Sequence, residues 1–186
     1  MIAPAGRARW PPVPDLIEIG DISIADALAA RGVALRPETP ADEPAVRAIY
    51  VAHRDVEFAA LPEPLRGSIV NSQFDMQRAA YRQSYSDAMF LLVTQAGAPI
   101  GRLYLAGAPD AIVLLDILID GRWRSAGIGG ALIEALVAAA AARGQAVRLH
   151  VEKSNRARGM YERLGFRVTG DAGLHWEMEA RAGQAR

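Results

Sequence analysis

Apolar residues recur along this chain with two periods, and elements of the two kinds alternate from residue 33 onward. Intervals of three and four, typical of one face of a helix, predict helices at 24–30, 40–53, 69–84, 127–143 and 156–164. Short alternating or continuous apolar runs predict strands at 33–36, 90–94, 100–106, 112–119, 147–152, 167–169 and 175–179. The mixture predicts an α/β fold in which 112–119, apolar except for Asp116, is a central strand.

Turn-forming residues mark the ends of these elements. Thr39 precedes Pro40, which suits the first turn of a helix, and Gly144 and Gly165 stand where a helix ends in a left-handed residue. Gly97 lies between two strand-like runs and predicts a hairpin. We therefore expect one folded domain over 33–180, preceded by a partly disordered extension (1–32) and followed by a flexible tail (181–186).

Composition narrows the class of protein. The 186 residues include 51% hydrophobic and 23% charged residues, which is typical of a soluble globular domain. Lys plus Arg equals Asp plus Glu, at 21 each, so no net charge favours nucleic acid or a membrane surface as a partner. No apolar run approaches a membrane-spanning length and residues 1–14 lack the apolar core of a signal peptide, so we expect a cytoplasmic protein.

Metal and thiol chemistry have little support in the sequence. The chain has no cysteine, which excludes disulfides, thiolate metal sites and a cysteine nucleophile. The three histidines, His53, His150 and His175, are far apart and match no metal-binding motif. We therefore predict no metal site.

A glycine-rich corner follows the central strand. Residues 124–129 read RSAGIG and lead directly into a predicted helix, so main-chain N–H groups and the positive end of the helix dipole converge there. This arrangement binds phosphate, although an ordinary glycine-rich connection remains an alternative. A dinucleotide motif would need glycine where Leu132 stands, and a P-loop would need a Gly-Lys-Ser/Thr tripeptide that the chain lacks.

Together with a second motif, this corner resembles the GNAT superfamily of N-acetyltransferases, including its bacterial members. The family's R/Q-x-x-G-x-G/A motif matches Arg124, Gly127 and Gly129. Its later Asn…Tyr-Glu-x-x-Gly-Phe element matches Asn155, Tyr161, Glu162, Gly165 and Phe166. The resemblance covers 112–169 firmly, extends back to residue 33, and does not include the first thirty residues.

The resemblance implies a central mixed, mostly antiparallel sheet, flanked by helices and splayed between its fourth and fifth strands, with acetyl-CoA or another acyl-CoA in the opening. Tyr161 would protonate the departing thiolate and Asp116 is the preferred base, with His150 and Glu152 as other candidates. The residues implied to bind the cofactor are Ile117, Leu118 and Ile119 for pantetheine, Arg124, Ser125, Ala126, Gly127, Ile128, Gly129 and Gly130 for the pyrophosphate, and Asn155 for the arm of the cofactor.

Structural alternatives remain open for each side chain. Tyr161 fits a core aromatic residue, Asn155 fits a helix N-cap, and Asp116 fits a partner for an arginine. The acceptor is expected near the first two helices and the third strand. Candidates there are His53, Arg54, Asp55, Glu57, Phe58, Gln73, Phe74, Gln77, Tyr81, Tyr85 and Tyr104, although most of the aromatic residues fit a core equally well.

The implied reaction is acetyl transfer from acetyl-CoA to a primary amine of a small molecule by direct attack. A protein or peptide acceptor, or a non-catalytic acyl-CoA-binding module, are the alternatives. Dimers are frequent in the family, so a homodimer remains open.

Overall fold

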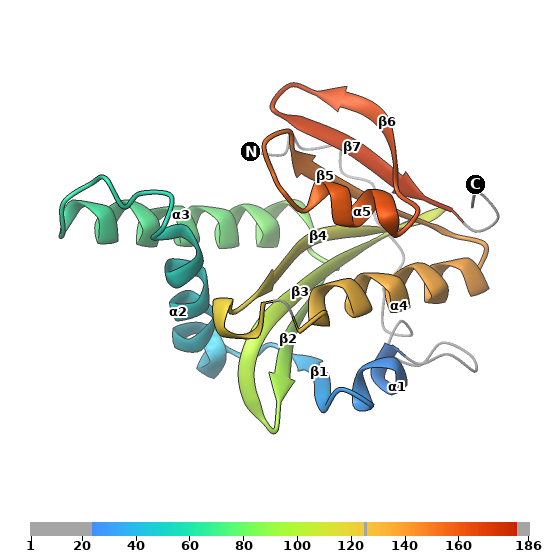
Figure 1. Ribbon diagram of the computed structural model, residues 1–186, viewed down its shortest axis with the longest axis horizontal. Helices are drawn as coiled ribbons and strands as arrows, with labels where there is room; N and C mark the ends of the chain where they lie inside the picture. Colours follow the sequence, from blue (N-terminus) through green and yellow to red (C-terminus); the bar gives the residue numbers. More distant parts are fainter. Residues whose placement is uncertain (1–23, 125, 182–186) are drawn as a thin grey trace.

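The computed structural model describes residues 24–124 and 126–181 and shows a seven-stranded sheet with helices on both faces (Figure 1). The strand order is β1-β2-β3-β4-β5-β7-β6. Within the described residues, β4 and β5 form the one parallel pair, and all other neighbours are antiparallel. The predicted mixed, mostly antiparallel sheet is confirmed. Its strands are β1 (Val33–Pro37), β2 (Met89–Gln95), β3 (Ala98–Ala108), β4 (Ala111–Ile119), β5 (Ala146–Glu152), β6 (Arg167–Ala172) and β7 (His175–Ala180).

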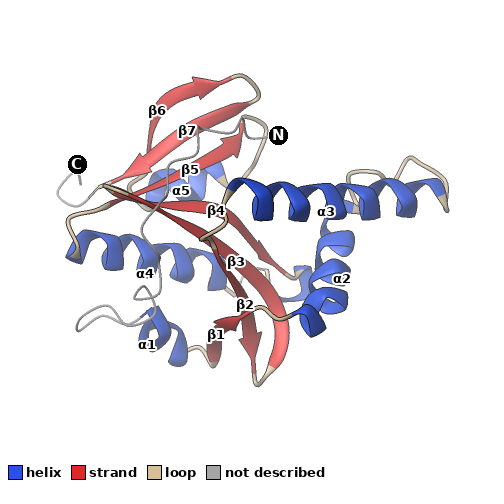
Figure 2. Cartoon of the chain, turned by 180° about the vertical axis from the view of Figure 1, so that it is seen from behind, coloured by secondary structure: helices blue, strands red, loops and turns tan. Residues whose placement is uncertain are grey.

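The helices form two layers around this sheet (Figure 2). One buried cluster joins α1, α4 and α5 to one face of the sheet, and a second joins α2 and α3 to the other face. Within the described part of the chain, none of the helices combines the length and apolar character needed to cross a bilayer. The helices are α1 (Ile24–Ala29), α2 (Glu43–Arg54), α3 (Leu65–Ser84), α4 (Ile128–Ala142) and α5 (Arg158–Arg163), with short 3₁₀ turns η2 (Pro40–Asp42) and η3 (Gly121–Trp123).

Helix α3 begins four residues earlier than its apolar spacing predicts. The side chain of Glu63 accepts a hydrogen bond from the Gly67 N–H, at 3.3 Å, so a polar contact supports the first turn before the apolar face begins. The glycine stops predicted for α4 and α5 are confirmed, because Gly144 and Gly165 have positive φ, and Gly32 follows α1 in the same conformation.

Helix α1 packs on the folded body although it belongs to the predicted extension. Ile24 and Leu28 are buried in the same cluster as Leu132 and Leu136 of α4. Residues 1–23 and 182–186 lie outside the described residues, so the predicted disorder of the extension and of the tail stays a prediction.

Strands β4 and β5 are paired over only part of their length. Their ladder runs from Ala111–Ala146 to Leu114–Leu149, after which β4 continues beside β3 and β5 continues beside β7. The two strands therefore separate, which confirms the predicted splay of the sheet between its fourth and fifth strands.

A β-bulge at Leu115 changes the faces to which β4 directs its side chains. Tyr104 of β3 pairs with Asp116, but the next residue of β3 pairs with Leu114, so Leu115 is the additional residue. Ile112 and Leu114 belong to the α4 cluster, and regular alternation would have sent Asp116 into that apolar layer. The bulge instead places Asp116 on the face that is covered by α2 and α3.

Gly101 is required by the close approach of β3 and β4. A Cβ atom at Gly101 would lie 2.8 Å from Cδ1 of Ile119 and still closer to the Leu118 carbonyl oxygen. We predict that Gly101→Ala lowers the free energy of unfolding by about 1–3 kcal/mol, because backbone atoms of β4 must move. Urea denaturation followed by circular dichroism measures this.

Gly159→Ala is the matched control for this prediction. Its Cβ would meet only the flexible end of Arg163, at 3.6 Å, in helix α5. We expect an unchanged or higher stability, by up to about 1 kcal/mol, because alanine favours the helix. Equal destabilisation by the two variants would contradict the steric account of Gly101.

Candidate active site

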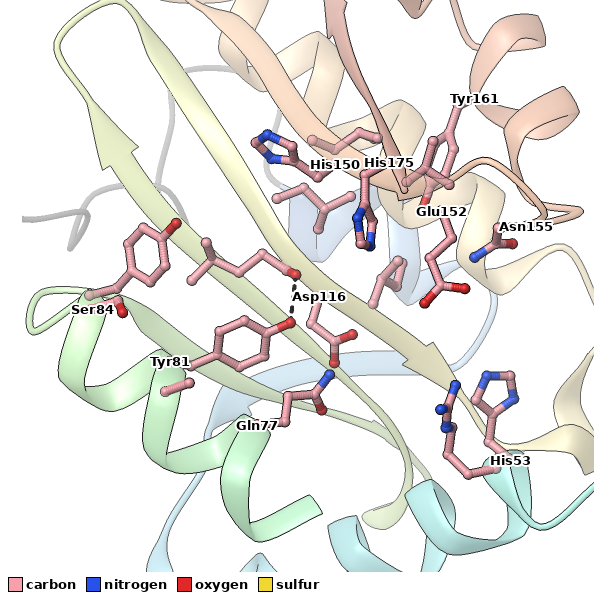
Figure 3. A pocket seen from close by; sticks show the side chains of 18 of the residues that line it. His53, Gln77, Tyr81, Ser84, Asp116, His150, Glu152, Asn155, Tyr161 and His175 are labelled. Atoms are coloured by element: carbon pink, nitrogen blue, oxygen red, sulfur yellow. Dashed lines mark hydrogen bonds between the residues drawn. The ribbon is translucent and has the colours of Figure 1, made fainter. Parts of the chain in front are cut away.

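The separation of β4 and β5 opens a cleft of ≈ 400 Å³ (Figure 3). One wall carries residues of β5, α5 and β7, and the opposite wall carries the C-terminal half of α3 and the end of α2, with β4 between them. The lining residues are His53, Arg54, Glu57, Gln77, Ala80, Tyr81, Ser84, Tyr85, Leu114, Leu115, Asp116, Ile117, Leu149, His150, Val151, Glu152, Asn155, Tyr161 and His175.

The backbone of β4 presents an unpaired edge to this cleft. Ile117, Leu118 and Ile119 pair with β3 on one side, and among the described strands no partner occupies their other side. Buried backbone N–H and C=O groups need partners, so an extended ligand can pair here as a strand would. The side chain of Leu118 is buried against α2 and α3, which fixes the orientation of this segment.

The glycine-rich corner is held open by Gly127. This residue has φ 72°, in the left-handed region that glycine tolerates, and precedes the first turn of α4. The Ala131 N–H bonds the Gly127 carbonyl, so the N–H groups of Ile128, Gly129 and Gly130 lie in a first turn, where helix donors lack intrahelical partners. Ser125 lies outside the described residues. The corner has the geometry of an anion site.

Two arginines at this corner have different partners. Arg122 is bound to Asp120, with Nη2 to Oδ2 at 2.6 Å. Arg124 instead donates to Nδ1 of His53, at the end of α2. Burial and, to a smaller degree, the positive charge of Arg124 lower the pKa of His53, which favours the neutral ring that this bond requires. Arg124 is therefore the less neutralised of the two charges.

Tyr161 comes from α5 and reaches the cleft from the side of β5 (Figure 3). The residue is 7% exposed, and its ring packs edge-on against Phe166, with ring centroids 5.6 Å apart. Burial, with a smaller contribution from the negative charge of Asp116, raises the pKa of Tyr161 to about 12. The hydroxyl is therefore protonated at neutral pH and can donate a proton. Tyr161 is therefore both a core aromatic residue, which was the alternative to a catalytic role, and a residue that lines the cleft.

Asn155 has a structural contact in addition to its place in the cleft. Its Oδ1 accepts a hydrogen bond from the Ala157 N–H at 2.8 Å, at the start of α5. The side-chain amide nitrogen has no partner within the described residues and remains available as a donor. The N-cap alternative and a ligand-binding role are therefore compatible.

Asp116 forms an ion pair with an arginine, which the sequence left open as the alternative to a catalytic role. Its Oδ2 lies 2.5 Å from Nε of Arg102, and Arg102 is only 3% exposed. The Arg102 guanidinium also donates to Gln77 Oε1 at 2.7 Å and lies 5.2 Å from the ring centroid of Tyr50 and 5.0 Å from that of Tyr104. The Asp116 oxygen that faces this buried cation is taken up by the ion pair. The catalytic role of Asp116 stays a prediction, and its geometry favours the ion-pair alternative.

Other proton acceptors line the same cleft. Glu152 is exposed, stands beside Asn155 (Figure 3), and has no ion-pair partner within the described residues. His150 lies 3.5 Å from Glu177. His175, which sequence reasoning did not single out, also reaches the cleft, because β7 pairs it with Glu152.

Most of the expected acceptor residues lie in the cleft or in the core, and Asp55, Phe58 and Gln73 belong to neither group. His53, Arg54, Glu57, Gln77, Tyr81 and Tyr85 line the cleft, whereas Phe74 and Tyr104 are buried in the core. The Tyr81 hydroxyl donates to the carbonyl of the bulge residue Leu115 at 3.1 Å (Figure 3). Sequence reasoning missed Arg102, although a charged residue in an apolar strand is the same signal that drew attention to Asp116.

Comparisons with known proteins agree with this geometry. Residues 65–175 match the model of the acetyltransferase (GNAT) domain. No curated protein matches the chain at a significant level. Within the described residues, no group of three His, Cys, Asp or Glu side chains is arranged to hold a metal ion.

Solved structures share the fold at low sequence identity. PaiA N-acetyltransferase from Thermoplasma acidophilum, solved with coenzyme A, has a TM-score of 0.62 and 19% identity, over 80% of this chain and 98% of its own. The ribosomal-protein-S18-alanine N-acetyltransferase of Escherichia coli has a TM-score of 0.53 and 21% identity, over 80% and 92%. A spermidine N-acetyltransferase SpeG chimera, from Vibrio cholerae and hSSAT, has a TM-score of 0.56 and 18% identity, over 80% and 95%.

The ion pair predicts the effect of removing Asp116. Asp116→Ala leaves the buried Arg102 charge uncompensated, so we expect the free energy of unfolding to fall by about 3–5 kcal/mol, measured by urea denaturation. Asp87→Ala, at an exposed turn residue, is the control and should change stability by less than about 0.5 kcal/mol. Full stability of Asp116→Ala together with lost turnover would instead support a role as base.

Proposed function

The chain belongs to the acetyltransferase (GNAT) family, and we propose that it transfers an acetyl group from acetyl-CoA to a primary amine of a small molecule. One observation carries the proposal: the unpaired edge of β4 and the hydroxyl-bearing ring of Tyr161 lie at the opening between β4 and β5, and the glycine corner before α4 follows the end of the same strand β4. These are the three groups that an extended thioester with a diphosphate would need.

Each part of the cofactor has a matching group in this proposal. The backbone of Ile117, Leu118 and Ile119 would pair with the amide-bearing arm, and the side-chain amide of Asn155 would donate to it. Main-chain N–H groups from Gly127 to Gly130, with the Arg124 guanidinium, would bind the diphosphate. Ser125 and Ala126 complete that loop in the sequence.

The side chains in the cleft supply what direct attack requires. As the amine nitrogen bonds to the thioester carbon, a β4 backbone N–H near 117–118 would stabilise the negative oxygen. When the carbon–sulfur bond breaks, Tyr161 would give its proton to the sulfur. The amine must lose a proton, and we assign its acceptance to Glu152, directly or through water, because Asp116 is committed to Arg102.

The dimensions of the cleft favour a small acceptor. A volume of ≈ 400 Å³ lies near the lower end of the range for small-molecule sites, and α2 and α3 form its wall opposite β5. Gln77 and Ser84 of α3, and Tyr85 directly after this helix, present polar groups on that wall. A protein acceptor would need an extended groove, so it is the second candidate.

Binding of acetyl-CoA is the first test. Wild-type protein should bind acetyl-CoA in a calorimetric titration, and Gly127→Glu should abolish binding, because the new carboxylate occupies the corner meant for phosphate. Gly144→Glu is the matched control, with the same left-handed backbone at the opposite end of α4, and should bind normally. Wild-type protein that binds no acetyl-CoA would refute the proposal.

Turnover tests the role of Tyr161 and the class of acceptor. With a panel of small primary amines, wild-type protein should release CoA, and Tyr161→Phe should lower kcat by about 10²-fold with little change in acetyl-CoA affinity. Loss of the proton donor affects the chemical step, whereas the phenyl ring keeps its packing on Phe166.

Peptides with free N-termini serve as the competing acceptors in the same assay. A higher kcat/KM for peptides than for every small amine would reverse the order of the two candidates. An unchanged kcat in Tyr161→Phe would remove Tyr161 from the mechanism.

A further inference from the structure

A residue of the N-terminal segment touches the glycine corner. Arg31 follows α1, and its Nη1 donates to the Ala126 carbonyl oxygen at 3.2 Å. The same Nη1 lies 3.5 Å from the position that a Cβ on Gly127 would take. A guanidinium from residue 31 is therefore in van der Waals reach of a loop nearly one hundred residues later in the chain.

The packing of α1 holds Arg31 in this place. Ile24 and Leu28 are buried on α4, and Gln95 Nε2 donates to the Arg31 carbonyl oxygen at 3.2 Å. Gly32, with φ 65°, then turns the chain into β1. The backbone of Arg31 is thus fixed from both sides, which lowers the entropy lost when its side chain orders on a ligand.

Arg31 lies outside the residues that match the family model, whereas Ala126 lies within them. The model match begins at residue 65, and the three structures compared above are covered over 92–98% of their own length but only 80% of this chain.

We propose that Arg31 is a positioning residue of the diphosphate loop and brings a second positive charge to it, so that α1 is part of the cofactor site. This inference rests on the proposed binding of acetyl-CoA. The bond to the Ala126 carbonyl fixes the peptide plane that Ala126 shares with the Gly127 N–H, and with it the turn before α4.

The second part of the role proposed for Arg31 is to supply positive charge to the diphosphate. A diphosphate carries two negative charges, whereas Arg122 is neutralised by Asp120, which leaves Arg124 alone on the η3 side. Within the described residues Arg31 has no ion-pair partner, and the bond to Ala126 uses one of its five N–H donors. Charge-assisted bonds from the remaining donors to phosphate oxygens are stronger than neutral ones.

The test compares ligands with and without the diphosphate. Dissociation constants for acetyl-CoA and for S-acetylpantetheine, which lacks the nucleotide and the diphosphate, are measured by titration for wild type, Arg31→Ala, Arg31→Lys and Arg31→Gln. Arg143→Ala, which removes one positive charge beside the opposite end of α4, is the matched control. Thermal denaturation of each variant checks that it is folded.

We expect Arg31→Ala to weaken acetyl-CoA binding by about tenfold and to leave S-acetylpantetheine within about twofold. Arg31→Lys keeps the charge and should lose least, Arg31→Gln keeps only a donor and should be intermediate, and Arg143→Ala should match wild type. The loss in Arg31→Ala should shrink at high salt, because phosphate contacts are screened.

Two results would overturn the inference. Unchanged acetyl-CoA affinity in Arg31→Ala would show that the contact to Ala126 is incidental. An equal loss for both ligands would show that α1 acts only through general stability. In either case the wild-type protein would still bind acetyl-CoA, so the failure is distinct from that of the proposed function, in which the wild type itself would not bind.

Discussion

Strands β4 and β5 share a ladder only as far as Leu114 and Leu149, and beyond these residues, among the described strands, β5 pairs with β7 alone while β4 pairs with β3 alone. Beyond that point, the backbone of each strand has hydrogen-bond partners along one edge and none from a described strand along the other. The exposed edge of β4 would be an aggregation hazard on the rim of a sheet, but here it faces an internal cleft. The polar backbone that the divergence leaves unpaired is the same backbone to which a ligand can bind.

A buried ionic contact fixes the opposite wall of this cleft. Arg102 is enclosed by aromatic rings, pairs with Asp116 and reaches Gln77, while Tyr81 bonds the bulge carbonyl of Leu115. The first of these contacts joins β3 to β4, and the other two join α3 to the sheet. A buried ion pair contributes little net stability compared with a well-packed apolar pair, but removing one partner is strongly unfavourable. The network therefore serves chiefly to specify where α3 lies relative to the strand edge.

Three helices converge on the glycine corner from different parts of the chain. Helix α4 begins there, α2 contributes His53 beside Arg124, and the segment after α1 contributes Arg31. Because each contact joins a different element, the shape of the corner depends on the packing of both helical layers. Through His53, the corner is joined to α2, whose C-terminal end also lines the cleft.

Much of this protein was determined by local sequence. Period and glycine stops predicted the order of strands and helices, because each depends on a few neighbouring positions. The splay of the sheet was implied by the resemblance to a family that the two motifs carry, and the site residues taken from that resemblance stay a prediction. Tertiary structure alone decided which face Asp116 occupies, since one additional residue at Leu115 reverses the alternation and no local pattern marks a bulge. It also decided the partners of Asp116 and the reach of Arg31, because both contacts join residues that are distant in the chain, and such pairings follow from packing rather than from spacing.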